Sequence, residues 1–108
     1  MLLKKIIKNL SPDIQNIKIE GLSLDSRQIK KNYIFFAVKG KKFNGERYIS
    51  DAISKGAKVI ICSQKCKIKV KKIPIIRVEN LSKIIVHICK KFYNNKPNNI
   101  IAVTGTNG

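Results

Sequence analysis

Two polar segments, each placed after a strand-like apolar run, carry the side chains most able to bind a ligand. The first is Leu24-Asp25-Ser26-Arg27, which presents a carboxylate, a hydroxyl and a guanidinium in succession. The second is the glycine-bounded loop 40–45, which contains Lys41, Lys42 and Phe43. Ligands of α/β proteins usually bind where strands end at one edge of the sheet. We therefore expect both segments to lie at the same edge of a small sheet.

A third segment, at the end of the sequence, has the beginning of a phosphate-binding pattern. The apolar run 100–103 leads into Thr104 and then Gly105, Thr106, Asn107 and Gly108. In such turns the backbone N–H groups face phosphate oxygens. The lysine, the Ser or Thr and the helix that complete a phosphate-binding loop are not in the sequence. We therefore interpret the chain as the N-terminal piece of a longer ATP-using protein, cut inside its nucleotide loop.

The segments that must position these loops alternate between strands and helices. Strands are predicted at 33–38, 57–62 and 74–78, which are rich in β-branched and aromatic residues. A helix capped by Asn44 and ended by Gly56 separates the first two. Asn80 caps a second helix, whose apolar stripe is Leu81, Ile84, Ile85, Ile88 and Phe92. A helix, a glycine and then an apolar strand indicate a parallel pair. These patterns predict an α/β fold: a small mixed sheet with flanking helices.

Four peripheral segments complete the pattern. Apolar residues at helical spacing in 2–10 predict a short amphipathic helix, which Ser11-Pro12 ends. Ile17 and Ile19 alternate with charged residues, as in an edge strand. The lysine-rich stretch 63–72 predicts a solvated loop or hairpin. Residues 94–99, with Pro97, predict a linker.

The charge of the chain is compatible with two interpretations. The formal net charge is +17, which is typical of proteins that bind nucleic acids. However, Lys, Ile and Asn account for 20, 20 and 10 of the 108 residues, whereas Arg accounts for 3. These over-used residues have A/T-rich codons, so an A/T-rich genome explains the bias without a nucleic-acid partner. Scarce arginine also disfavours base recognition, and we favour the codon explanation.

The cysteines and the apolar runs indicate where the protein is located. Cys62, Cys66 and Cys89 have no zinc-binding spacing, which predicts free thiols in a reducing cytoplasm and no metal site. Residues 1–10 lack the continuous apolar core of a signal peptide. No apolar run approaches the about 20 residues that a membrane-spanning helix needs. We expect a cytoplasmic protein of one domain plus the start of another.

Five blocks of this sequence resemble the Mur ligases of peptidoglycan synthesis. They are Leu24–Arg27, Phe35–Gly40, Asn44–Ile49, the two pairs Ala52-Ile53 and Gly56-Ala57 taken as one block, and Val103–Gly108. The resemblance covers most of residues 22–108, and it implies a three-domain enzyme. The N-terminal domain would be residues 1–97, which hold the UDP part of the substrate. Residues 98–108 would be the linker, the first strand and the start of the phosphate loop of a central ATPase domain.

The resemblance also implies a reaction. ATP and Mg²⁺ activate a carboxylate as an acyl phosphate, and an amine then displaces phosphate to form an amide. Leu24-Asp25-Ser26-Arg27 with the Thr-Gly-Thr-Asn-Gly ending favours the member that adds the third amino acid to UDP-N-acetylmuramoyl-L-alanyl-D-glutamate. That amino acid is meso-diaminopimelate or lysine, and we favour diaminopimelate. The alternatives are the sister ligase that adds D-Ala-D-Ala and a basic nucleic-acid-binding domain. The 108-residue chain is expected to be a monomer, and inactive alone.

Site residues follow from the positions that match the family. Leu24 and Ser26 are implied to contact uridine, and Lys41, Lys42 and Phe43 to line the second wall of that site. Gly105 to Gly108 are implied to begin the ATP site, and no residue here is expected to be catalytic. From the residues alone, Ser26 either binds a ligand or caps its turn, and Phe43 either stacks on a base or seals the core. Asp25 and Arg27 either pair to order the loop or contact substrate.

Overall fold

The computed structural model describes residues 1–42 and 44–94, which form a four-stranded sheet in the order β1-β2-β3-β4. The strands are β1 (Gly21–Ser23), β2 (Tyr33–Ala37), β3 (Ala57–Ser63) and β4 (Ile75–Val78). Three 3₁₀ turns, η1 (Leu3–Lys5), η2 (Ser26–Gln28) and η3 (Gly45–Tyr48), and two helices, α1 (Ile49–Ser54) and α2 (Leu81–Asn94), complete the described fold. The predicted α/β class, with its small sheet and flanking helices, is confirmed.

All three strand pairs of this sheet are parallel, although the sequence predicted a mixed sheet. The physical reason is that, after each strand, the chain crosses back to the starting end of the sheet before the next strand begins. The returns are made by η2, by η3 with α1, and by the segment 64–74, which we call the crossover segment. The antiparallel bridges among the described residues, Leu2 with Lys18 and Lys39 with Asn44, lie outside the named strands.

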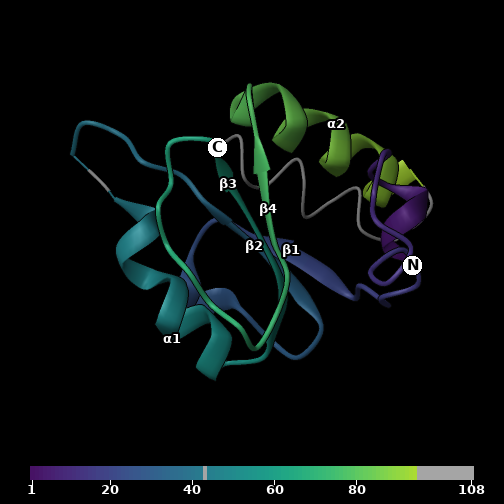
Figure 1. Cartoon of the computed structure of the whole chain (residues 1–108), viewed down its shortest axis with the longest axis horizontal. Coiled ribbons are helices and arrows are strands. Elements are labelled where there is room, and N and C mark those ends of the chain that lie inside the picture. Colours follow the sequence, from purple (N-terminus) through teal and green to yellow (C-terminus); the bar gives the residue numbers. More distant parts are fainter. Residues whose placement is uncertain (43, 95–108) are drawn as a thin grey trace.

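Both faces of the sheet are covered, which explains the continuous apolar runs of β2 and β3. Alternate residues of each strand point to opposite faces. One face of the sheet, which we call the first face, carries the strand residues Ile34, Phe36, Val59 and Ile61. These side chains form a core cluster with residues of α2 and of the N-terminal segment 1–19. Figure 1 shows α2 and the N-terminal segment on one side of the sheet and α1 on the other.

The opposite face of the sheet, which we call the second face, has its own core cluster, built from the other alternate positions of β2 and β3. Phe35, Ala37, Ile60 and Cys62 point to this face and pack with residues of α1. The crossover segment contributes buried Cys66 and the half-buried residues Ile68, Val70 and Ile73. The crossover segment therefore covers part of the second face, a place that a helix usually takes in α/β crossovers. Its lysines, Lys65, Lys67, Lys69, Lys71 and Lys72, are exposed, as predicted.

The prediction of a helix at residues 2–10 is wrong, because only the short 3₁₀ turn η1 forms there. The backbone N–H groups of Leu3 and Lys4 donate to Ile17 and Gln15 (2.8 and 3.0 Å), so they are used outside the segment. Asn9 has a φ of 62°, which a right-handed helix does not allow. The edge strand predicted at 17–19 is likewise reduced to the bridge between Leu2 and Lys18. The apolar side chains Leu3, Ile6 and Ile7 are nevertheless buried.

The helix caps are those predicted from the sequence. The Asn44 side chain accepts from the N–H of Glu46 (3.0 Å) at the start of η3, which runs directly into α1. Gly56, with a φ of 116°, follows the end of α1. The Asn80 side chain accepts from the N–H of Lys83 (3.2 Å) at the start of α2. The residues after Asn94, where the linker and last strand were predicted, lie outside the described part of the chain.

Candidate functional site at the carboxyl edge of the sheet

The two predicted binding loops follow neighbouring parallel strands, so they begin at the same edge of the sheet. We call it the carboxyl edge because the strands end there. The first loop follows β1, and Ser26 at the start of η2 is buried, with 4% of its surface exposed. Its hydroxyl takes part in none of the side-chain hydrogen bonds formed among residues 1–42 and 44–94. No fully buried side-chain nitrogen or oxygen among the described residues lacks a partner, so this hydroxyl keeps some exposure of its own and can meet a ligand.

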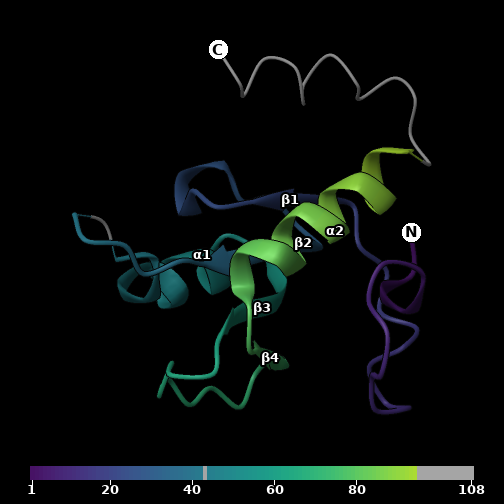
Figure 2. The same cartoon turned by 90° about the horizontal axis from the view of Figure 1, so that it is seen from above.

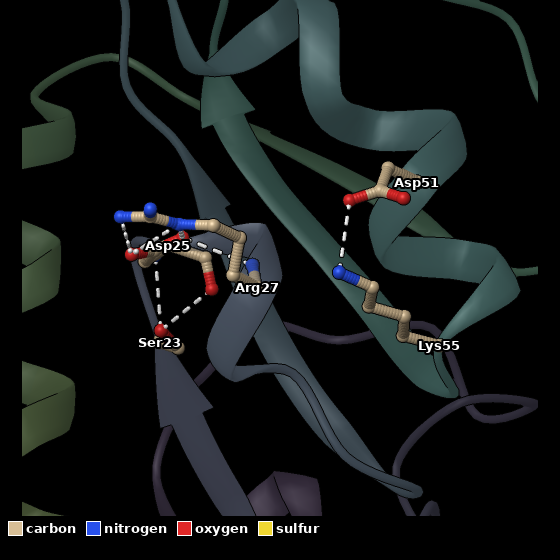
Figure 3. Close-up of polar contacts among 5 residues, drawn as sticks. All are labelled: Ser23, Asp25, Arg27, Asp51 and Lys55. Carbon is tan, nitrogen blue, oxygen red and sulfur yellow. Dashed lines mark hydrogen bonds and ion pairs between the residues drawn. The ribbon is translucent and has the colours of Figure 1, made fainter.

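Polar contacts within the first loop fix its shape (Figure 3). The Asp25 N–H donates to the Ser23 hydroxyl (2.9 Å), which in turn donates to the Asp25 carbonyl (3.0 Å). The Asp25 carboxylate accepts from the N–H of Arg27 (2.9 Å) and so caps η2. Asp25 and Arg27 therefore do order the loop, which was one of the two roles predicted for them.

The side chains of Asp25 and Arg27 also form an ion pair. Nε of Arg27 donates to both carboxylate oxygens (3.1 and 3.3 Å), and Nη2 donates to Oδ2 (2.9 Å). The hydrogen bonds from Arg27 hold the pKa of Asp25 below its ordinary value, and the same contact raises the pKa of Arg27. Both groups are therefore charged at neutral pH. Because the Arg27 side chain is 81% exposed, we assign no large stability to the pair.

The second loop is closed at its base. The Gly45 N–H donates to the Val38 carbonyl (2.7 Å), and Lys39 forms a bridge with Asn44. A Cβ at Gly45 would lie 2.8 Å from both the N and the O of Val38, so the two backbones approach where only glycine fits. Lys41 and Lys42 are exposed on the loop thus closed. Phe43 lies outside the described residues, and its predicted role stays a prediction.

A cavity of about 580 Å³ lies at the carboxyl edge next to the second loop. It is lined by residues after β2, at the end of β3 and at the start of α2: Val38, Lys39, Ser63, Glu79, Asn80, Leu81 and Ser82. None of these residues was among those predicted for the site. A signal was available, because each of them ends or follows one of the strands predicted at 33–38, 57–62 and 74–78.

Two large apolar or largely apolar side chains near the loops are exposed. Leu24, directly after β1, is 46% exposed, and Tyr48, at the end of η3, is 43% exposed. Single exposed apolar residues are common at protein surfaces. Leu24 was predicted to contact uridine, and its exposure beside buried Ser26 leaves it accessible to a ligand.

The described residues do not suggest other chemistry. Cys62, Cys66 and Cys89 are free, and burial raises the pKa of Cys62 to about 12, with a further contribution from a hydrogen bond with Cys66. No group of three or more His, Cys, Asp or Glu within residues 1–42 and 44–94 could hold a metal ion. No helix in the same ranges is long and apolar enough to cross a membrane. Gly105 to Gly108, the predicted ATP contacts, lie outside the described residues.

Known proteins resemble this chain over most of its length. Residues 18–93 match the profile of the Mur ligase family, catalytic domain. The UDP-N-acetylmuramoyl-L-alanyl-D-glutamate–2,6-diaminopimelate ligase of Rickettsia montanensis is 41% identical over 93% of this chain and 20% of that protein. The ligase of the same description from Clostridium tetani is 40% identical over 100% of this chain and 24% of that protein.

A solved structure is also similar. The MurF ligase from Thermotoga maritima, in complex with ADP, superposes with a TM-score of 0.56 and 30% sequence identity. The match covers 68% of this chain and 17% of that one. The chain thus spans about a sixth to a quarter of the length of the proteins named above. The family profile alone covers well over half of the 108 residues. On this evidence the chain belongs to the Mur ligase family.

Proposed function

We propose that this chain is the nucleotide-docking part of a MurE-type ligase. That enzyme adds meso-diaminopimelate to UDP-N-acetylmuramoyl-L-alanyl-D-glutamate in peptidoglycan synthesis. The observation that carries the proposal is that diaminopimelate ligases match 93–100% of the chain at about 40% identity. The likeness to a MurF ligase, at 30% identity over 68% of the chain, gives less support to the D-Ala-D-Ala-adding alternative.

In this proposal the described domain binds the UDP end of the substrate at the carboxyl edge. Leu24 supplies an exposed apolar surface and Ser26 a hydroxyl, while Lys41, Lys42 and Phe43 form the second wall. Two ammonium groups beside a diphosphate are electrostatically favourable. The edge also contains the cavity beside the second loop, which is large enough to receive part of a nucleotide sugar. Residues 1–97 make up this domain, and residues 98–108 lead into the ATPase domain.

The chemical step belongs to the ATP-binding and amino-acid-binding parts of the whole enzyme. There ATP, with Mg²⁺, supplies the phosphoryl group that activates the D-glutamate carboxylate. Gly105 to Gly108 are the proposed start of the ATP-binding loop. We expect the 108-residue chain to bind substrate as a monomer without turnover. We place the protein in the cytoplasm, since its three free thiols suit a reducing compartment.

Calorimetric titration with UDP-N-acetylmuramoyl-L-alanyl-D-glutamate tests the proposal directly. We expect saturable one-to-one binding at both low and high salt. Single-stranded DNA is the control, because non-specific binding to nucleic acid collapses as salt rises. Binding of DNA alone would instead favour the nucleic-acid alternative that the +17 charge raised. Binding of neither would mean that the chain does not dock the substrate by itself.

The contribution of Ser26 can be measured in the same experiment. Replacing Ser26 with Ala removes one hydroxyl from a site with 4% exposure and changes little volume. A single hydrogen bond is worth about 1 kcal/mol, so we expect roughly fivefold weaker binding. Ser50→Ala, in the exposed part of α1, is the matched control. Unchanged affinity of a folded Ser26→Ala protein would remove Ser26 from the site.

A further inference from the structure

Arg27 is exposed, and the Asp25 carboxylate orients its side chain. Most exposed arginines move freely, because their long side chains have many rotamers. Here the side chain is 81% exposed, yet its Nε and Nη2 atoms both bond to the Asp25 carboxylate, at 2.9–3.3 Å. Asp25 is itself held by the Ser23 hydroxyl and by the Arg27 backbone. The guanidinium therefore sits on a preorganised loop at the carboxyl edge (Figure 3).

The ion pair leaves part of the guanidinium available. An arginine has five N–H donors, and those of Nε and one of Nη2 are used by Asp25. Nη1 makes no hydrogen bond to the residues described in 1–42 and 44–94. Its N–H groups are thus free to meet an acceptor that reaches the carboxyl edge from solvent.

The charges around Arg27 favour an anion as that acceptor. Asp25 is the nearest acidic group, and its charge is compensated by Arg27 itself. Lys55 is close enough to lower the pKa of Asp25 slightly, although its ammonium also pairs with Asp51 (3.3 Å). The neighbouring loop adds exposed Lys41 and Lys42. A phosphate at this edge would meet more cationic than anionic groups, and it would lie next to Ser26.

We propose that Arg27 is a substrate-contacting residue and that Asp25 is its positioning residue. Nη1 of Arg27 donates to a phosphate oxygen of the nucleoside diphosphate, while Leu24 and Ser26 contact the nucleoside. This inference rests on the proposed docking function and deepens it, because it assigns the anionic part of the ligand to the β1 loop. The bidentate contact with Asp25 keeps the guanidinium at the carboxyl edge before the ligand arrives.

The test compares uridine with UDP in calorimetric titrations of the chain. For Arg27→Ala we expect about tenfold weaker binding of UDP, the worth of a charge-assisted hydrogen bond, and less than twofold change for uridine. Arg27→Lys should recover only part of the UDP affinity, because an ammonium cannot pair with Asp25 as a fork does. Asp25→Asn should weaken UDP binding severalfold without weakening uridine binding. Lys30→Ala, an exposed residue close in sequence, is the control for charge alone.

Each outcome separates the inference from the function on which it rests. Wild-type binding of UDP together with unchanged UDP binding by Arg27→Ala would overturn the inference and leave the docking function standing. Equal losses for uridine and UDP, or an equal loss in Lys30→Ala, would also overturn it, since the effect would come from loop structure or from net charge. Absence of binding of UDP and of the whole UDP-linked dipeptide by the wild-type chain would refute both. Circular dichroism and thermal midpoints confirm that each variant is folded.

Discussion

Gly45→Ala is expected to weaken both the stability of the domain and its ligand binding, because position 45 has no room for a side chain. A Cβ there would lie 2.8 Å from the backbone N and O of Val38. Backbone atoms cannot move aside as the end of a flexible side chain can. The two segments must separate, which breaks or lengthens the 2.7 Å hydrogen bond from Gly45 to Val38.

The magnitude follows from these two effects. Loss of one hydrogen bond costs about 1 kcal/mol. Forcing a methyl group into a filled space costs about 1–3 kcal/mol more. We therefore expect a loss of about 2–4 kcal/mol in the free energy of unfolding, which corresponds to a fall in thermal midpoint of at least about 8 °C for a domain of this size.

Urea denaturation and calorimetric titration with the UDP-linked dipeptide measure the two consequences. Lys42→Ala is the matched control, because it removes a charge from the same loop without disturbing its base. Lys42→Ala should weaken binding while leaving the urea midpoint unchanged. A Gly45→Ala protein with the wild-type midpoint and the wild-type affinity would refute the closed loop base and its part in the site.

Three further results are expected. Arg77→Ala should lower the urea midpoint and speed proteolysis within the crossover segment, because the Arg77 side chain donates to the carbonyls of Cys66 (2.8 Å) and Ile68; cleavage elsewhere first would contradict this clamp. In native protein at pH 8, iodoacetamide should modify Cys89 before buried Cys62, whose pKa is about 12, and mass spectrometry gives the order. The pKa of Asp25 is lowered, so its ion pair is complete above the ordinary carboxyl value of 3.8 and is lost only as pH falls through the lower folded value; an NMR titration with a midpoint at or above 3.8 would contradict the pair.

Much of the fold was predictable because local signals and tertiary packing agree in the middle of the chain. The apolar patterns of β2, β3 and α2 predicted these elements, and the structure contains all three. Local signals also marked helix ends: Asn80 caps α2, and Gly56 follows α1. The N-terminal segment was not predictable from its helical spacing. Its backbone groups bond to residues 15–19, a contact that no local pattern encodes. The same apolar spacing buries Leu3 and Ile6 without a helix.

The shared edge of the two candidate binding loops was predictable, but their detailed geometry was not. Strand ends and polar loops were enough to place the loops of Ser26 and Lys41 at one edge. Burial of Ser26 depends on how η2 packs, which the sequence does not reveal. The orientation of Arg27 depends on three hydrogen bonds within one short loop, and no sequence pattern encodes these bonds. The cavity beside α2 needed the strand order, which only the structure supplies.

The two faces of the sheet are completed at different times as the chain is synthesised at the ribosome. Strands β1 to β3 and α1, which build most of the second face, are complete once residue 63 has left the exit tunnel. The first face is completed by α2, which lies against the sheet (Figure 2). Because Ile88 and Phe92 of α2 belong to its core, this face waits for the 31 residues from Gln64 to Asn94. At 5–20 residues per second this wait lasts roughly 2–6 s. During that interval Ile34, Phe36, Val59 and Ile61 depend on the N-terminal segment alone for cover. The nascent chain should bind holding chaperones most strongly at these lengths.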